Sequence, residues 1–421
     1  MKFKIKYLIQ CLYCTIYLCV LFLNIYALYI DSLMPRICSY ILVGLIFLMH
    51  FSTKGNKGIY LLKRLMYISI SFLLVSLLSI IMFGNTSIFK FEFLWNVLQP
   101  SVFMITGAII AIRVEDKNRD IIYKIIMIGI LITIFLDFSG NFITYDYRHY
   151  SIYSNALLYG SFILVAFYLV YYLVKNVYLK TILLIVCFYA CILTSSRSAW
   201  VSLVVTFTVC ILFRKNENLT ISKLVFRGIF VVVLSIVLFV FGSQIETFIN
   251  DVFSMVSAKI DNVLNSTSAV FRVDAIEYLW EKSSFLSIVF GNGVGATKDL
   301  VTNAGLQISR FQTSDNQYMT LLYDYGLMGV FWIVKLCQLV FRNVFENQKT
   351  ASNELKMLSI IILSLMITGF FYETIGNANI AAIALTFIGI LCQLDYKHKK
   401  ELNHSESITR HVRKFGKRIS E

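Results

Sequence analysis

Runs of about twenty apolar residues recur along the chain, and this is the length that an α-helix needs to cross the hydrocarbon of a bilayer. Hydrophobic residues make up 58% of the 421 residues and charged residues only 15%, whereas soluble domains average about 25% charged residues. Backbone groups inside hydrocarbon must be hydrogen-bonded, and continuous apolar runs without two-residue alternation favour helices over a barrel. The sequence therefore predicts an all-α polytopic integral membrane protein.

The apolar runs and the charged breaks between them predict about twelve transmembrane helices and one large external loop. The expected spans are 7–30, 37–51, 65–83, 93–112, 121–138, 155–173, 179–194, 198–213, 228–245, 317–340, 357–374 and 378–394. Basic residues gather in alternate breaks, which the positive-inside rule places in the cytoplasm together with both termini. The chain then divides into nine helices over 1–245, an extracytoplasmic loop subdomain over 246–316, three helices over 317–394 and a basic cytoplasmic tail over 395–421.

The net charge of +14 follows from this topology and does not indicate nucleic-acid binding, because no basic face is interleaved with aromatic residues. The nine cysteines fall in apolar stretches, where Cys packs as a small hydrophobe. The basic N-terminus leads into an apolar run without a small-residue cleavage site, which predicts a retained first helix rather than a signal peptide. Only one histidine lies on the outer side, so we expect neither a metal nor another cofactor.

Four polar clusters lie on the outer side, at or near the membrane boundary. They are Asp146, Arg148 and His149 with Asn155; the Thr194–Ser198 turn around Arg197; Arg272 with Asp274 and Glu277; and Ser314–Asn316, leading into a helix that contains Asp324. An arginine at such a boundary is costly unless it meets an anion, and its planar guanidinium suits the paired oxygens of a phosphate. The three arginines therefore predict a diphosphate site. The alternative is that they snorkel to the interface or pair with the nearby carboxylates.

Two acidic residues near the fourth cluster are open to two interpretations each. Asp315 precedes an apolar helix, so its carboxylate could cap the helix or act as a base. Asp324 lies about two turns deeper, where an ionisable group is a functional candidate or a partner in helix-to-helix hydrogen bonding. Before them, Gly291, Gly293 and Gly295 predict a tight external turn rather than a nucleotide loop, because the βαβ setting is missing. Residues 272–282 predict a helix in that loop, with Val273, Ile276 and Trp280 on one face.

The order of these motifs resembles the O-antigen polymerase and O-antigen ligase superfamily of bacterial envelope enzymes. The resemblance is carried by Tyr147–Asn155, by Thr-Ser-Ser-Arg-Ser-Ala-Trp at 194–200, by Phe271–Gly295, and by Ser314–Tyr318 through Tyr325–Gly329. Ligases of this superfamily typically present a histidine where this chain has Asp315. The resemblance therefore favours the polymerase branch.

Membership of the polymerase branch implies a glycosyltransferase that joins undecaprenyl-diphosphate-linked oligosaccharide repeat units at the outer face of the bacterial cytoplasmic membrane. The product would be O-antigen, capsule or exopolysaccharide, and a chain-length regulator and a flippase would be partners in the pathway. We expect Asp315, Arg197 and Arg272 to be catalytic, the first as base and the arginines as stabilisers of the diphosphate. The expected substrate-binding residues are Arg148, Asn155, Asn316, Tyr318 and Trp280.

Three other functions remain open from the sequence. A ligase of the same superfamily, which moves finished polymer to another acceptor, would share nearly every feature except Asp315. A flippase for lipid-linked sugars would be expected to show internal repeats and charged helices at the midplane, whereas the polar clusters here gather on one side. A purely structural scaffold leaves the three outer arginines without a role.

Overall fold

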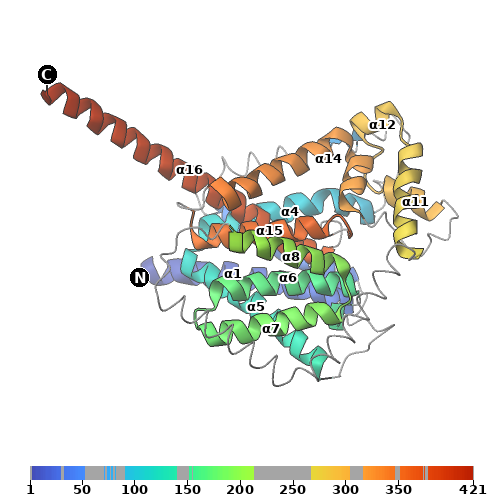
Figure 1. Cartoon of the computed structure of the whole chain (residues 1–421). Helices are drawn as coiled ribbons and strands as arrows, with labels where there is room; N and C mark the ends of the chain where they lie inside the picture. Colours follow the sequence, from blue (N-terminus) through green and yellow to red (C-terminus); the bar gives the residue numbers. More distant parts are fainter. Residues whose placement is uncertain are drawn as a thin grey trace.

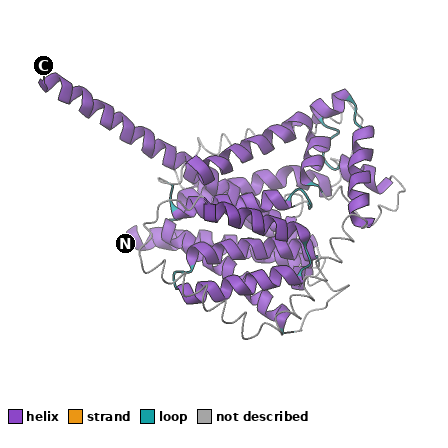
Figure 2. Cartoon of the chain, in the orientation of Figure 1, coloured by secondary structure: helices purple, strands orange, loops and turns teal. Residues whose placement is uncertain are grey.

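The computed structural model describes residues 2–29, 33–52, 91–139, 151–153, 155–212, 267–303, 316–346, 351–372 and 378–420, with a few single positions at 71–81 and 374. Within these ranges all regular structure is helical (Figure 2). Six helices are long and apolar enough to cross a membrane, and further apolar helices are shorter. The chain is an all-α polytopic membrane protein, as its composition predicts.

The described helices follow the expected spans, apart from 65–83 and 228–245, which lie mostly outside the described residues. The helices of the bundle are α1 (Lys2–Tyr29), α2 (Leu33–Ser52), α4 (Phe91–Arg113), α5 (Asp116–Phe138), α6 (Ala156–Leu173), α7 (Val177–Leu193), α8 (Arg197–Leu212), α14 (Gln317–Phe341), α15 (Asn353–Thr368) and α16 (Ala378–Ser420), with short turns η2 (Ser151–Tyr153) and η4 (Arg342–Glu346). The last helix does not stop near 394, since it continues through the basic tail to Ser420.

The two ends of the bundle differ in what they carry (Figure 1). Both chain termini lie at one end, and the helices of the large loop lie at the other. We call these the termini end and the loop end. Helices joined by a short described connection run in opposite directions, and α6, α8 and α14 begin at the loop end, where α15 ends.

Helix α6 is the central helix of the bundle. Most of its residues are buried, with Tyr159 and Phe162 fully enclosed, and it packs against α5, α7, α8 and α15. Helix α7 is different, because Ile182 and Phe188 are 59% and 50% exposed. In a membrane protein such a face suits lipid, so we place α7 at the periphery and α6 in the core.

The described part of the large loop contains three short helices: α11 (Thr267–Glu281), α12 (Phe285–Phe290) and α13 (Ala296–Asn303). The predicted helix from residue 272 is therefore present, but Trp280, one of the residues expected on its apolar face, is not buried. Ala275 and Leu279 are the buried residues, whereas Trp280 is 58% exposed. The reason is tertiary, because α11 packs toward α13 within the loop, a contact that periodicity alone does not specify.

Helix α14 is interrupted by a kink at Gly326, where φ is 60° and ψ is −145°. This left-handed conformation is open to glycine and strained for other residues. Close packing supports the kink, since a Cβ on Gly329 would lie 2.3 Å from the Leu321 carbonyl oxygen. The Gly-Leu-x-Gly motif at 326–329 thus folds α14 into two arms, one from Gln317 to the kink and one beyond it.

Candidate functional site

Three helix N-termini meet at the loop end, and each is closed by an uncharged polar side chain. The Asn155 side chain accepts from the Leu157 N–H at 2.8 Å, and that of Asn316 accepts from Tyr318 and Met319 at 3.0 and 3.1 Å. Ser196 precedes α8 in the same way, 3.5 Å from the Ala199 N–H. Free N–H groups and helix dipoles make such ends favourable for anions. The capping role considered for Asp315 belongs to its neighbour Asn316.

The turn between α7 and α8 is held by its own hydroxyl groups. Thr194 Oγ1 donates to the Cys191 carbonyl at 2.7 Å and accepts from the Ser196 N–H at 3.1 Å. Ser195 adopts a positive φ of 51°, and the Ser196 and Ser198 hydroxyls lie 3.0 Å apart. This is the polar hairpin that the sequence predicts. It is a rigid mount for the residue that begins α8.

Arg197 is that first residue of α8, and it is partly buried. Its guanidinium therefore stands at the positive end of the helix dipole. Trp200, one turn further on, donates from Nε1 to the Cys191 carbonyl at 2.7 Å and fixes α8 against the end of α7. An anion at this turn would meet both a cation and the positive end of the helix dipole.

Close packing joins the three helix starts. A Cβ on Gly160 of α6 would lie 2.8 Å from the Ala199 Cβ of α8, so the two backbones approach closely just below Asn155. From the other side of α8, Ser202 Oγ donates to the Ser364 carbonyl of α15 at 2.6 Å. The end of α15 in turn meets α14, where the Gln317 N–H donates to the Gly369 carbonyl at 2.9 Å.

Tyr318 lies in the first turn of α14 and faces α15. Its hydroxyl donates to the Met366 carbonyl at 2.5 Å, and its ring lies 4.3 Å from the Phe370 ring between centroids. The hydroxyl is therefore engaged within the bundle. A contact between Tyr318 and substrate would have to use the face of its ring.

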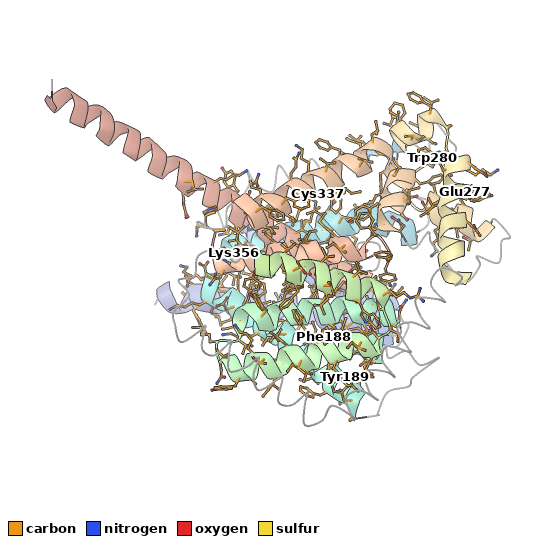
Figure 3. The ribbon with its side chains drawn as sticks, in the orientation of Figure 1. Phe188, Tyr189, Glu277, Trp280, Cys337 and Lys356 are labelled. Carbon is orange, nitrogen blue, oxygen red and sulfur yellow. The ribbon has the colours of Figure 1, made fainter. Side chains whose placement is uncertain are left out.

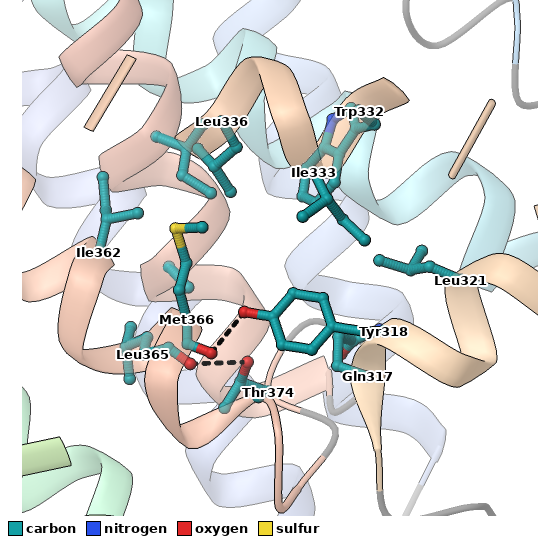
Figure 4. Close-up of a pocket in the computed structure, with 13 residues that line it drawn as sticks. Gln317, Tyr318, Leu321, Trp332, Ile333, Leu336, Ile362, Leu365, Met366 and Thr374 are labelled. Carbon is teal, nitrogen blue, oxygen red and sulfur yellow. Dashed lines mark hydrogen bonds between the residues drawn. The ribbon is translucent and has the colours of Figure 1, made fainter. Parts of the chain in front are cut away.

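An apolar pocket opens between the two arms of α14, α15 and α16 (Figure 4). The empty space between its lining side chains is about 430 Å³, which includes open solvent at the mouth. Gln317 and Gly369 lie at its loop-end side. The apolar lining includes Leu321, Trp332, Leu336, Leu365, Met366 and Ile388. A polar helix start thus borders an apolar space within the bundle.

Asp324 fastens the large loop to α14. Its Oδ2 accepts from the Gly295 N–H at 3.0 Å, and its Oδ1 accepts from the N–H and hydroxyl of Thr297 at 2.9 and 2.7 Å. The carboxylate caps α13 from another helix, so Asp324 takes part in helix-to-helix hydrogen bonding, one of the two interpretations that the sequence leaves open. Gly291 packs so closely that a Cβ there would lie 2.4 Å from the Asp324 carbonyl oxygen. The glycine run is the tight turn that the sequence predicts.

The remaining predicted residues are placed unevenly by the structure. Arg148 and Asp315 lie outside the described residues, together with Asp146 and His149. Arg272 lies in α11, although only its backbone is described. Trp280 and Glu277 lie on α11 at the loop end, far from Lys356 of α15 (Figure 3). The structure thus brings Asn155, Arg197, Asn316 and Tyr318 to one end of the bundle, with Trp280 on the loop at the same end.

Asp137 is a loop-end carboxylate that the sequence analysis passed over. It lies near the end of α5 and is 4% exposed, with the Tyr159 hydroxyl donating to Oδ2 at 3.4 Å. The available signal was its position inside an expected span, where an ionisable side chain is a functional candidate by default.

Comparison with known proteins gives a family match over part of the chain that forms this site. Residues 182–334 match the family model described as O-antigen ligase. None of the curated proteins compared with the chain matches it. The matched segment runs from α7 past the kink of α14 and contains the last three of the four motifs. It confirms the resemblance to the O-antigen polymerase and ligase superfamily.

Proposed function

We propose that this chain, which carries a domain of the O-antigen polymerase and ligase superfamily, joins undecaprenyl-diphosphate-linked oligosaccharide repeat units at the outer face of the bacterial cytoplasmic membrane. The observation that carries the proposal is the loop end itself. Helix N-termini and Arg197 gather there beside an apolar pocket. This arrangement suits an amphiphile with an anionic headgroup on a long apolar chain.

The reaction breaks one bond and forms another. A hydroxyl of one sugar attacks the anomeric carbon of a second, the bond from that carbon to the diphosphate oxygen breaks, and the diphosphate leaves with the electron pair. Negative charge grows on the leaving group, where Arg197, Arg272 and Arg148 would stabilise it. The free energy comes from the lipid diphosphate, so the proposal needs no nucleotide.

Asp315 is the proposed base, which takes the proton of the attacking hydroxyl. Asn316 already caps α14, so the neighbouring carboxylate is not needed for that purpose. A positioned base contributes roughly 10²–10⁴-fold to such a step. Asp146 and Asp274 are the other carboxylates in the predicted clusters that could serve.

The sugar-binding residues would divide the work between the loop and the bundle. Trp280 exposes its ring on α11, and an exposed aromatic face suits stacking on a sugar. Asn155 and Asn316 would hold headgroup oxygens through the helix ends that they cap, and Tyr318 would meet the lipid chain where its ring lines the pocket. A ligase-type transfer to another acceptor is the second candidate, because the matching family model is described as O-antigen ligase.

The test uses the full-length protein in nanodiscs, supplied with lipid-linked repeat units alone. We expect the wild type to give a ladder of polymers on a gel, and Asp315→Asn to lose at least about 100-fold in rate. Asp120→Asn, an exposed carboxylate of α5 at the termini end, is the matched control. A normal ladder from Asp315→Asn would exclude it as the base. Transfer only when a separate lipid acceptor is added would favour the ligase.

The proposed sidedness is tested separately, by labelling with a membrane-impermeant thiol reagent. The nine native cysteines form no disulfide and would first be replaced. We expect a Cys at Ser284, on the exposed loop, to be labelled in intact cells, and a Cys at Lys175, at the termini end, only after permeabilisation. The reverse pattern would place the loop end in the cytoplasm.

A further inference from the structure

Three amide or guanidinium side chains in α1, α2 and α4 each bury an atom that has no hydrogen-bond partner among the described residues. The atoms are Asn24 Oδ1, Arg36 Nε and Gln99 Nε2, and no residue in the described ranges bonds to them. Asn24 and Gln99 are 0% and 1% exposed. Buried polar groups are nearly always hydrogen-bonded, because a buried donor or acceptor without a hydrogen bond costs free energy. Their position therefore requires an explanation.

Helices α2 and α4 run parallel and in constant register. The Tyr40 ring of α2 lies 6.1 Å from the Phe103 ring of α4 between centroids, and at the termini end Arg113 Nε donates to His50 Nδ1 at 3.1 Å. In both pairs the α4 residue follows the α2 residue by 63 positions. Gln99 follows Arg36 by the same interval. The two unpartnered donors therefore lie level with each other.

Asn24 lies near the same level, on the neighbouring helix. It belongs to the last turns of α1, and Arg36 to the first turn of α2, and these helices pack along one another across a short connection. The Asn24 amide donates to the Val20 carbonyl of its own helix at 2.8 Å, which leaves Oδ1 over. Two donors and one acceptor thus lie at the same height in the bundle without bonding one another. This arrangement suits a ligand-binding site better than an internal hydrogen-bond network.

The charge of Arg36 points to an anion. The ion pairs of the described residues involve Lys6, Arg119, Arg342 and Lys399, and Arg36 takes part in none of them. A guanidinium at the edge of the membrane is expensive without a counter-charge. Its planar N–H groups match phosphate oxygens. The first turn of α2 lies at the loop end, where the expected topology puts the outer boundary of the membrane.

We infer that Arg36 and Gln99 bind the phosphate group of a membrane lipid, with Asn24 accepting a hydrogen bond from a hydroxyl of the same headgroup. The Arg36 Nε and Gln99 Nε2 atoms would each donate to a phosphate oxygen. If the proposed function holds, on which this step rests, the lipid is the second lipid-linked unit. Joining two such units requires two diphosphates to be held at once, one leaving and one retained.

The experiment measures binding and needs no catalysis. Native mass spectrometry of the full-length protein counts bound undecaprenyl diphosphate in one arm and phosphatidylglycerol in the other. The variants are Arg36→Gln and Gln99→Leu. Arg113→Gln is the matched control, since Arg113 lies on the same helix pair at the opposite end and is bonded to His50. We expect each test variant to lower the affinity for one bound undecaprenyl diphosphate at least tenfold. The control should bind this lipid as the wild type does.

A second variant guards against simple misfolding. Gln99→Glu places a carboxylate level with Arg36, so we expect it to raise the melting temperature through an ion pair and to abolish the lipid binding through repulsion. If the variants lose binding of phosphatidylglycerol only, the residues bind a lipid phosphate but do not hold a substrate of the reaction. Unchanged binding of both lipids in all three variants would overturn the inference. A wild type that binds lipid here yet makes no polymer would count against the proposed function only.

Discussion

The two ends of the bundle satisfy their charges in opposite ways. At the termini end Arg119 is 2% exposed, and its Nε and Nη2 donate to the two oxygens of Glu354 at 2.7 and 2.8 Å. Its Nη1 donates to the Val114 carbonyl at 2.6 Å. At the loop end the helix starts are closed by uncharged caps, and Arg36 has no ion pair with any described residue. Arginine thus forms a buried structural ion pair at the termini end, whereas at the loop end it is available to a ligand.

The largest expected effect comes from breaking the buried Arg119–Glu354 ion pair. Glu354→Gln leaves the buried Arg119 guanidinium with only the exposed Asp116 carboxylate as a charged partner, and removing one partner of a buried pair costs about 3–5 kcal/mol. We expect a strongly lowered melting temperature and a poor yield of folded protein. Asp120→Asn, an exposed carboxylate near the same end, is the control. Wild-type stability for Glu354→Gln would mean that the termini end does not depend on this pair.

The next effect is on activity and belongs to the loop end. Arg197→Lys keeps the positive charge but loses the planar pair of donors, so we expect a fall of about 10²–10³-fold in polymerisation rate with an unchanged melting temperature. Arg342→Lys is the contrasting change, because Arg342 pairs with Asp395 at the termini end and should retain activity. The comparison between the ends would fail if both variants lost activity equally.

Much of the bundle can be predicted from the sequence because lipid imposes a simple rule on it. Apolar runs of sufficient length must be helices, and the turn at Thr194–Ser198 follows from polar residues between two such runs. Arg36 shows a limit of the same reasoning. Arg36 is a basic residue beside an outer connection, where the positive-inside rule does not place one. That it has no ion pair with a described residue, and that it lies level with Gln99, can be seen only in the structure.

The loop could be predicted less well, because its contacts join residues distant in the sequence. The Asp324 carboxylate is bonded to Gly295 and Thr297, and no local pattern links these positions. The same reason applies to α11, where packing toward α13 buries Ala275 and Leu279 and leaves Trp280 exposed. The choice between Asp315 and Asn316 as cap depends on one residue of helix boundary, which is the least predictable feature of a helix.

A smaller effect would test whether the loop is fixed to the bundle by Asp324. In Asp324→Asn one acceptor oxygen becomes an N–H donor, so a backbone N–H of Gly295 or Thr297 loses its partner, at a cost of about 1–3 kcal/mol. We expect faster hydrogen exchange across residues 291–303 while the helices of the bundle keep their protection. Glu281→Gln, at an exposed carboxylate of α11, is the control. Unchanged exchange would show that the glycine packing alone holds the loop.

The smallest effect belongs to the exposed ion pair at the termini end. Lys6 Nζ lies 2.7 Å from Glu115 Oε1, with side chains 65% and 60% exposed. The hydrogen bond from Lys6, with a further one from Gln10, lowers the pKa of Glu115. A lowered carboxyl pKa stabilises the fold above the unfolded value of about 4.3, and this contribution is lost as the pH falls through the lower folded value.

We therefore expect Lys6→Gln to lower the melting temperature slightly at pH 7, and the difference from the wild type to vanish in strong acid. Screening by water and salt makes any exposed pair weak, so the same change in high salt should also remove the difference. Melting curves of both proteins at the two pH values test this. A loss at pH 7 as large as that of Glu354→Gln would contradict the distinction between exposed and buried pairs. The stability of the termini end would then depend on its surface charges as much as on the buried Arg119–Glu354 ion pair.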